Sequence, residues 1–103
     1  MINLQVDECF AFDYLSILNV KTTKSNNQEE AYLACYKNLK DQLGDKFDAV
    51  INSHEYENLL IANYKTFDAV DKARSGGNIT AKEVDDTNFV RYNAKIELHK
   101  KFF

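Results

Sequence analysis

The chain has 103 residues, which is the usual size of one domain. Its formal net charge is −3, whereas nucleic-acid-binding proteins usually carry an excess of basic residues. Hydrophobic residues make up 45% of it and charged residues 28%, a globular composition that excludes a disordered tail. No apolar run reaches the roughly 20 residues of a membrane span, and the start lacks the order of a signal peptide. We therefore expect one cytoplasmic domain over residues 1–103, with neither nucleic acid nor membrane as a partner.

Two helices are predicted in the first 44 residues. Apolar side chains follow Asp7 almost without interruption, which predicts a largely buried helix over about residues 6–22. A polar loop follows, in which Asn26 or Asn27 can cap a second helix that ends at Gly44. The apolar stripe of this helix consists of Tyr32, Cys35, Tyr36, Leu39 and Leu43. Cys9 and Cys35 are too few for a disulfide framework, so we expect buried reduced thiols.

The second half of the chain predicts a long helical hairpin. A short piece over residues 45–51 leads to Asn52-Ser53-His54-Glu55, which resembles a capping box and begins a helix that runs to Gly76-Gly77. Thr80 with Glu83 is the strongest capping box in the chain and begins the last helix. The predicted apolar stripe of the first of these helices is Tyr56, Leu60, Asn63, Phe67, Val70 and Arg74. That of the second is Phe89, Tyr92 or Asn93, Ile96, His99 or Lys100, and Phe103.

The two stripes also predict how the hairpin pairs. A turn near residue 78 sets Phe67 opposite Phe89 and Asn63 opposite Asn93. A slip of one turn would leave an amide unpaired at a cost of roughly 1–3 kcal/mol, so we expect Asn63 and Asn93 to approach one another in the interior. A third group such as Asp13 or Lys21 could join them. The predicted fold is all-α, an antiparallel helical bundle built on this hairpin, with the first helix buried against it.

Three stretches resemble a small bacterial and phage family of helical proteins of unknown function. Residues 13–21 match the family's pattern Asp-x-Leu-Ser/Thr-Ile-Leu-x-Ile/Val-Lys. The second stretch consists of Asn63, Phe67, Asp68, Asp71 and Arg74, with Phe67 where the family usually has Trp. The third retains Asn93 and Lys100 but has Val90 where the family favours Tyr and Ile96 where it favours Arg. The resemblance implies a helical fold with a polar set on facing helices, and no known reaction.

The candidate site is this polar set. Its members are Asp13, Lys21, Asn63, Asp71, Arg74 and Asn93. The favoured interpretation is a group of ion pairs and amide bonds that fix the register of the helices, and the other is a ligand pocket. We expect no catalytic residue, metal site or cofactor.

Acidic pairs suggest an alternative. The pairs are Asp45/Asp48, Asp68/Asp71 and Glu83/Asp86. All-helical nucleotide pyrophosphohydrolases of the MazG type bind Mg²⁺ with such pairs, and carboxylates converging from two helices would favour this alternative. Against it, Glu83 belongs to a capping box, and Lys65, Lys72 and Arg74 lie near Asp68 and Asp71. The paired Glu motif of that class is also missing. We interpret the basic residues Arg91, Lys95, Lys100 and Lys101 as a solvated face and the last turn of a helix.

The expected function is that of a non-catalytic small interaction or regulatory protein that forms a homo-oligomer. Helices roughly 30 Å long with aromatic stripes on more than one face are hard to cover in so short a chain. The chain has more aromatic residues than one contact between helices needs, and the additional ones are Phe10, Phe12, Tyr32, Tyr36, Tyr64 and Phe102. The alternatives are the Mg²⁺-dependent hydrolase and a ligand-binding helical protein that uses the polar set.

Overall fold

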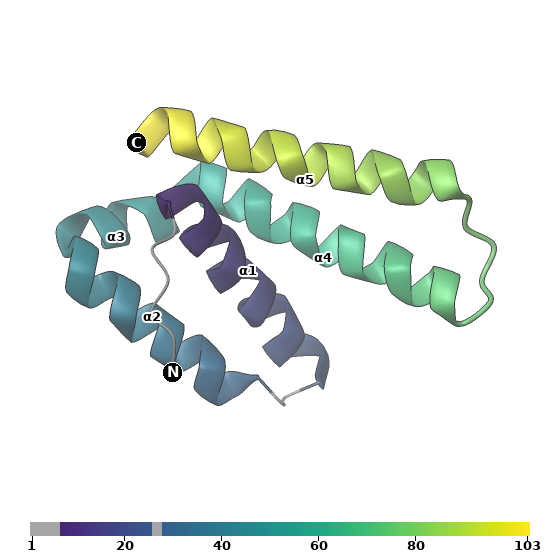
Figure 1. Ribbon diagram of the computed structural model, residues 1–103, viewed down its shortest axis with the longest axis horizontal. Helices are drawn as coiled ribbons and strands as arrows, with labels where there is room; N and C mark the ends of the chain where they lie inside the picture. The colour runs from purple at the N-terminus through teal and green to yellow at the C-terminus, as the bar shows by residue number, and fades with distance from the viewer. Residues whose placement is uncertain (1–6, 26–27) are drawn as a thin grey trace.

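The computed structural model describes residues 7–25 and 28–103, and in these residues it contains five helices and no strand (Figure 1). The helices are α1 (Glu8–Ser25), α2 (Glu29–Leu43), α3 (Asp45–Ile51), α4 (His54–Arg74) and α5 (Ala81–Phe102). Figure 1 shows α4 and α5 as a long antiparallel pair, with α1 between this pair and α2. The predicted all-α bundle built on a helical hairpin is confirmed. None of the described helices is long and apolar enough to cross a membrane.

Local capping residues fix where the helices begin. Ser53 is the N-cap of α4, and its hydroxyl accepts a hydrogen bond from the Tyr56 amide at 3.1 Å. The sequence predicted a reciprocal capping box here, and the structure has this single capping bond instead. At the start of α5, Thr80 and Glu83 form the predicted capping box. Asn26 and Asn27, the predicted caps of α2, lie outside the described residues.

Gly44 separates α2 from α3. Its backbone has a φ of +59°, in the left-handed region that only glycine adopts at little cost, and its amide donates to the Lys40 carbonyl at 2.8 Å. The chain therefore ends α2 at the predicted glycine and turns directly into α3. This turn carries Phe47 and Val50 of α3 into the core.

The hydrophobic core lies at one end of the hairpin, where α1 and α3 meet α4 and α5. Its central ring is Phe12, whose centroid lies 5.9 Å from that of Phe47 and 6.0 Å from that of Phe103. The buried core residues are Phe12, Leu15, Phe47, Val50, Tyr56, Leu59 and Leu98. Half-buried side chains of α2, among them Tyr32 and Tyr36, cover this core from outside.

The residues of α4 and α5 lie at the predicted heights opposite one another, but the two helices do not bury the predicted faces. The Lys101 ammonium lies 2.7 Å from the Glu55 carboxylate, as expected of a hairpin that turns near residue 78. The predicted Phe67–Phe89 layer is wrong, because Phe89 is 66% exposed. The residues that α4 buries are Tyr56, Leu59, Ala62, Asn63, Thr66 and Ala69. Several of them are small, so α4 and α5 approach closely, and the Thr66 hydroxyl lies 3.4 Å from the Thr87 carbonyl oxygen.

Both cysteines are free thiols, as predicted, but they are half-buried rather than buried. The Cys9 thiol donates to the Lys95 carbonyl at 3.5 Å, which links the start of α1 to α5. Burial raises the pKa of Cys9 and of Cys35 above the ordinary value. Both thiols therefore stay protonated at neutral pH.

Replacement of the N-cap residue of α5 tests whether the capping box stabilises this helix. Thr80→Ala removes both the hydroxyl acceptor and the reciprocal capping box, so we expect a loss of about 1 kcal/mol in the free energy of unfolding. Urea unfolding followed by circular dichroism measures it. The matched control is Thr23→Ala, because the exposed Thr23 hydroxyl bonds only to the Asn19 carbonyl within α1. An equal loss in both variants would contradict the capping argument.

Candidate functional site

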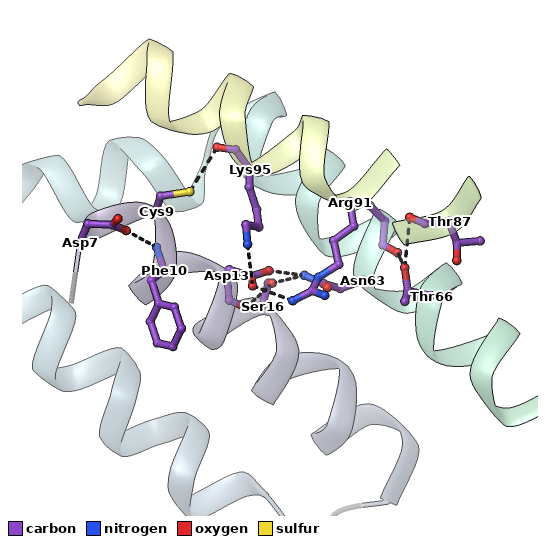
Figure 2. Close-up of polar contacts among 11 residues, drawn as sticks. Asp7, Cys9, Phe10, Asp13, Ser16, Asn63, Thr66, Thr87, Arg91 and Lys95 are labelled. Carbon is purple, nitrogen blue, oxygen red and sulfur yellow. Dashed lines mark hydrogen bonds and ion pairs between the residues drawn. The ribbon is translucent and has the colours of Figure 1, made fainter. Parts of the chain in front are cut away.

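A buried polar network joins α1, α4 and α5 (Figure 2). At its centre is Asp13 of α1, which is 4% exposed. Its Oδ1 accepts from the Asn63 amide at 3.1 Å, and its Oδ2 lies 2.7 Å from Arg91 Nη2 and 3.6 Å from Lys95 Nζ. With Ser16, these residues form what we call the Asp13 network.

Ser16 lies one turn beyond Asp13 on the same face of α1. Its hydroxyl donates to the Asp13 carbonyl at 2.7 Å and accepts from the Asn63 amide nitrogen at 2.5 Å. Asn63 therefore donates to two acceptors on α1, and its buried amide group is satisfied. These bonds fix both the rotation and the height of α4 relative to α1.

The charge of Asp13 is balanced from α5. Arg91 and Lys95 are four residues apart, so both side chains leave the same face of that helix. Each side chain is 28% exposed, so the cations reach from the solvent edge to the buried carboxylate. Arg91 Nε is buried and has no hydrogen-bond partner among the described residues. Because both carboxylate oxygens accept from the protein itself, the geometry supports a role in holding three helices together.

The structure brings two of the six predicted polar residues together, Asp13 and Asn63. Asp71 lies elsewhere, with its carboxylate 3.4 Å from Lys24 Nζ, and Asp68 bonds to the same ammonium. A lysine of α1 therefore pairs with these carboxylates, in place of the neighbouring lysines and arginine that the sequence suggested. The other three of the six are exposed: Lys21, Arg74 and Asn93.

The predicted approach of Asn63 to Asn93 is wrong. Asn63 is buried against α1, whereas Asn93 is exposed and lines a groove on the outer side of α4 and α5. The reason is the helical period of 3.6 residues, which places Asn93 about 200° around the axis from Arg91. Once Arg91 turns inward to Asp13, Asn93 must face outward.

Sequence reasoning missed Ser16, Arg91 and Lys95. The interpretation of Arg91 and Lys95 as part of a solvated face is wrong, because both contact the buried carboxylate. The signal that could have found them is an aspartate inside an apolar helix, which requires a cationic partner elsewhere in the chain. Two cations with a spacing of four on the last helix meet that requirement.

The acidic pairs do not converge. Among residues 7–25 and 28–103 no group of three or more His, Cys, Asp or Glu side chains is placed to hold a metal ion. Asp48 pairs instead with Lys40 at 3.2 Å, and Glu83 belongs to the capping box. The convergence of carboxylates from two helices that the hydrolase alternative requires is therefore not found in this part of the chain.

The outer side of the hairpin carries a shallow groove of about 350 Å³, which we call the outer groove. The small side chains of Ala62 and Ala94 line it where α4 and α5 approach. Beside them, Ile61 is 45% and Val90 55% exposed. The polar residues that line it are Glu55, Asn58, Lys65, Asn93 and Glu97. The outer groove is thus an apolar surface with charged groups of both signs around it.

The chain matches no known protein family, no curated protein and no solved structure. The family resemblance of the three sequence stretches stays a prediction.

Removal of the central carboxylate tests the Asp13 network. Asp13→Ala leaves Arg91 facing the bundle without its partner, so we expect a loss of about 3 kcal/mol in the free energy of unfolding. The control is Asp41→Ala, an exposed aspartate of α2, with an expected change below about 0.5 kcal/mol. Urea unfolding measures both. A double-mutant cycle with Arg91→Ala should give a coupling energy above about 1 kcal/mol, and additive losses would contradict the pairing.

Proposed function

We propose that the protein is a non-catalytic interaction protein that acts as a homo-oligomer, in its simplest form a twofold dimer joined through the outer groove. The observation that carries the proposal is the exposure of Ile61 and Val90, which line the outer groove between α4 and α5. Covering a side chain of this kind contributes roughly 1.5–3 kcal/mol. A second copy supplies the same side chains in return, since a twofold interface uses one patch twice.

The arrangement of the helices leaves this side of the hairpin open. In Figure 1, α1, α2 and α3 all lie on one side of the α4–α5 pair. The hairpin also extends beyond the core toward its turn. Large apolar side chains on the uncovered side therefore have no cover from the described part of the chain, which favours a partner there.

The charges of the outer groove are complementary to themselves. Lys65 lies three residues from Ala62 toward the hairpin turn, and Glu97 lies three residues from Ala94 in the opposite direction. A twofold axis that crosses the groove at the two alanines therefore places Lys65 of each copy opposite Glu97 of the other copy, so the interface contains this pair two times. Within the described residues Lys65 has no ion pair. The one ion pair of Glu97 among the described residues is an exposed contact of 4.0 Å with Lys100, so Lys65 and Glu97 can both turn to a partner.

The mass in solution tests the proposal. We expect sedimentation equilibrium at micromolar concentration to give about twice the 11.9 kDa of one chain. Ile61→Glu places a charge in the apolar contact and should give the monomer mass. The matched control is Leu33→Glu on α2, because Leu33 is 56% exposed but lies away from the outer groove. A monomer mass for the unaltered chain, or an equal effect of both variants, would reject the interface.

Charge reversal tests the twofold geometry separately. Lys65→Glu or Glu97→Lys alone sets like charges opposite one another, and we expect the dimer dissociation constant to rise about tenfold. The double variant restores both pairs in the reversed sense and should recover most of the loss. Two losses that simply add would place the interface elsewhere.

A further inference from the structure

A second hollow, of about 440 Å³, lies on another side of α4, where α1, α2 and the turn between α3 and α4 meet. Its volume falls within the range of roughly 300–1,000 Å³ that is usual for small-molecule sites. Three tyrosines line it, Tyr32 and Tyr36 from α2 and Tyr56 from α4. We call it the tyrosine pocket. It is separate from the Asp13 network and from the outer groove.

The aromatic side chains of the pocket are held in place by the core. The Tyr36 ring meets Phe47 edge to face at a centroid distance of 4.8 Å, and Tyr56 meets Phe12 in the same manner at 6.3 Å. The centroids of Tyr32 and Tyr36 are 6.1 Å apart, with 52° between the ring planes. Two neighbouring rings at an angle to one another provide two non-parallel walls. Because the core fixes these rings, little ordering is needed on binding.

The polar groups of the pocket favour a cation. Among the described residues that line it, Glu57 carries the one formal charge. The Ser53 hydroxyl donates away from the pocket to the Val50 carbonyl at 2.6 Å, and the Asn52 amide donates to the Asp48 carbonyl at 2.9 Å. The other polar side chains of the described lining are Asn19 and the three tyrosines. An anion would find no positive charge among these described residues.

Two of the tyrosine hydroxyls are held in the uncharged form by burial. Burial raises the pKa of Tyr32 and, more strongly, that of Tyr56 above the ordinary value. These two rings thus present neutral π-systems at neutral pH. The negative face of such a ring attracts a cation, and the attraction is strongest where water is excluded.

We propose that the tyrosine pocket binds a methylated organic ammonium ion. The inference rests on three tyrosines and one carboxylate around a hollow of ligand size, with no cationic side chain among the described residues that line it. A quaternary ammonium group has methyl surfaces for the rings and a charge for Glu57, and it has no N–H groups that would need acceptors. Free choline-like molecules and trimethylated lysine side chains both carry this group. The inference does not depend on the proposed dimer.

Titration of the intact chain with choline, followed by nuclear magnetic resonance or calorimetry, tests the proposal. The neutral control is 3,3-dimethyl-1-butanol, in which carbon replaces the quaternary nitrogen of choline at nearly the same shape. We expect saturable binding of choline and binding of the alcohol that is at least about tenfold weaker.

A short peptide with one trimethyllysine provides a second experiment. Tighter binding of the peptide than of choline assigns the site to a modified protein, and the reverse order assigns it to a free molecule. Equal binding of choline and the alcohol, or no binding of either cation, would overturn the proposal.

Variants locate the site. Tyr32→Leu removes a ring and should weaken choline binding about tenfold, whereas Tyr32→Phe keeps the ring and should bind within about twofold of the original chain. Glu57→Gln should weaken binding severalfold, and the loss should shrink at high salt. The matched control is Tyr92→Leu, since Tyr92 is exposed on α5 and does not line the pocket. Circular dichroism verifies that each variant is folded. Unchanged affinity in Tyr32→Leu would place any choline site elsewhere.

Discussion

The rest of the structure depends on the buried charge of Asp13. A carboxylate removed from water is stable only when partners surround it, so α4 and α5 must present Asn63 and Arg91 at its level. This requirement fixes the rotation of two long helices at once. With Arg91 turned toward α1, Val90 and Asn93 fall on the other side of α5, where they line the outer groove. One polar contact thus decides which apolar side chains the hairpin leaves exposed.

The rotation of α4 likewise separates the two hollows. Asn63 faces α1, and Tyr56, seven residues earlier, lies on nearly the same face of α4, where it lines the tyrosine pocket. Ile61 and Ala62 lie toward the outer groove instead. One side of α4 therefore carries the polar network and the pocket, and another side carries the proposed interface. Small substitutions in the outer groove need not disturb the pocket, because the network holds the helix at a fixed angle.

Local chemistry explains which parts of the fold could be predicted from the sequence. The starts of α4 and α5 were predictable from Ser53 and Thr80, and the end of α2 from Gly44, because each signal acts within about one turn. The buried face of α4 was not, since this helix contacts α1 on one side and α5 on another, and no single stripe describes two contacts. Asp13 and Asn63 stood out as polar residues in apolar surroundings. Arg91 did not, because it lies 78 residues from Asp13 in the sequence and its role exists only after folding.

The apolar surface of the hairpin has a steric origin. The residues between α4 and α5 are small, as at Ala62 and Thr66, so the two backbones approach closely and leave little room for rings between them. Larger apolar side chains such as Phe89 must then lie outside the seam, although the composition of the chain would allow them inside. The small residues between α4 and α5 are consequently the cause both of the close packing of the hairpin and of the exposure of its large side chains. A second copy that covers this surface would offset the exposure without loosening the seam, which is the physical reason for placing the proposed interface on the outer groove.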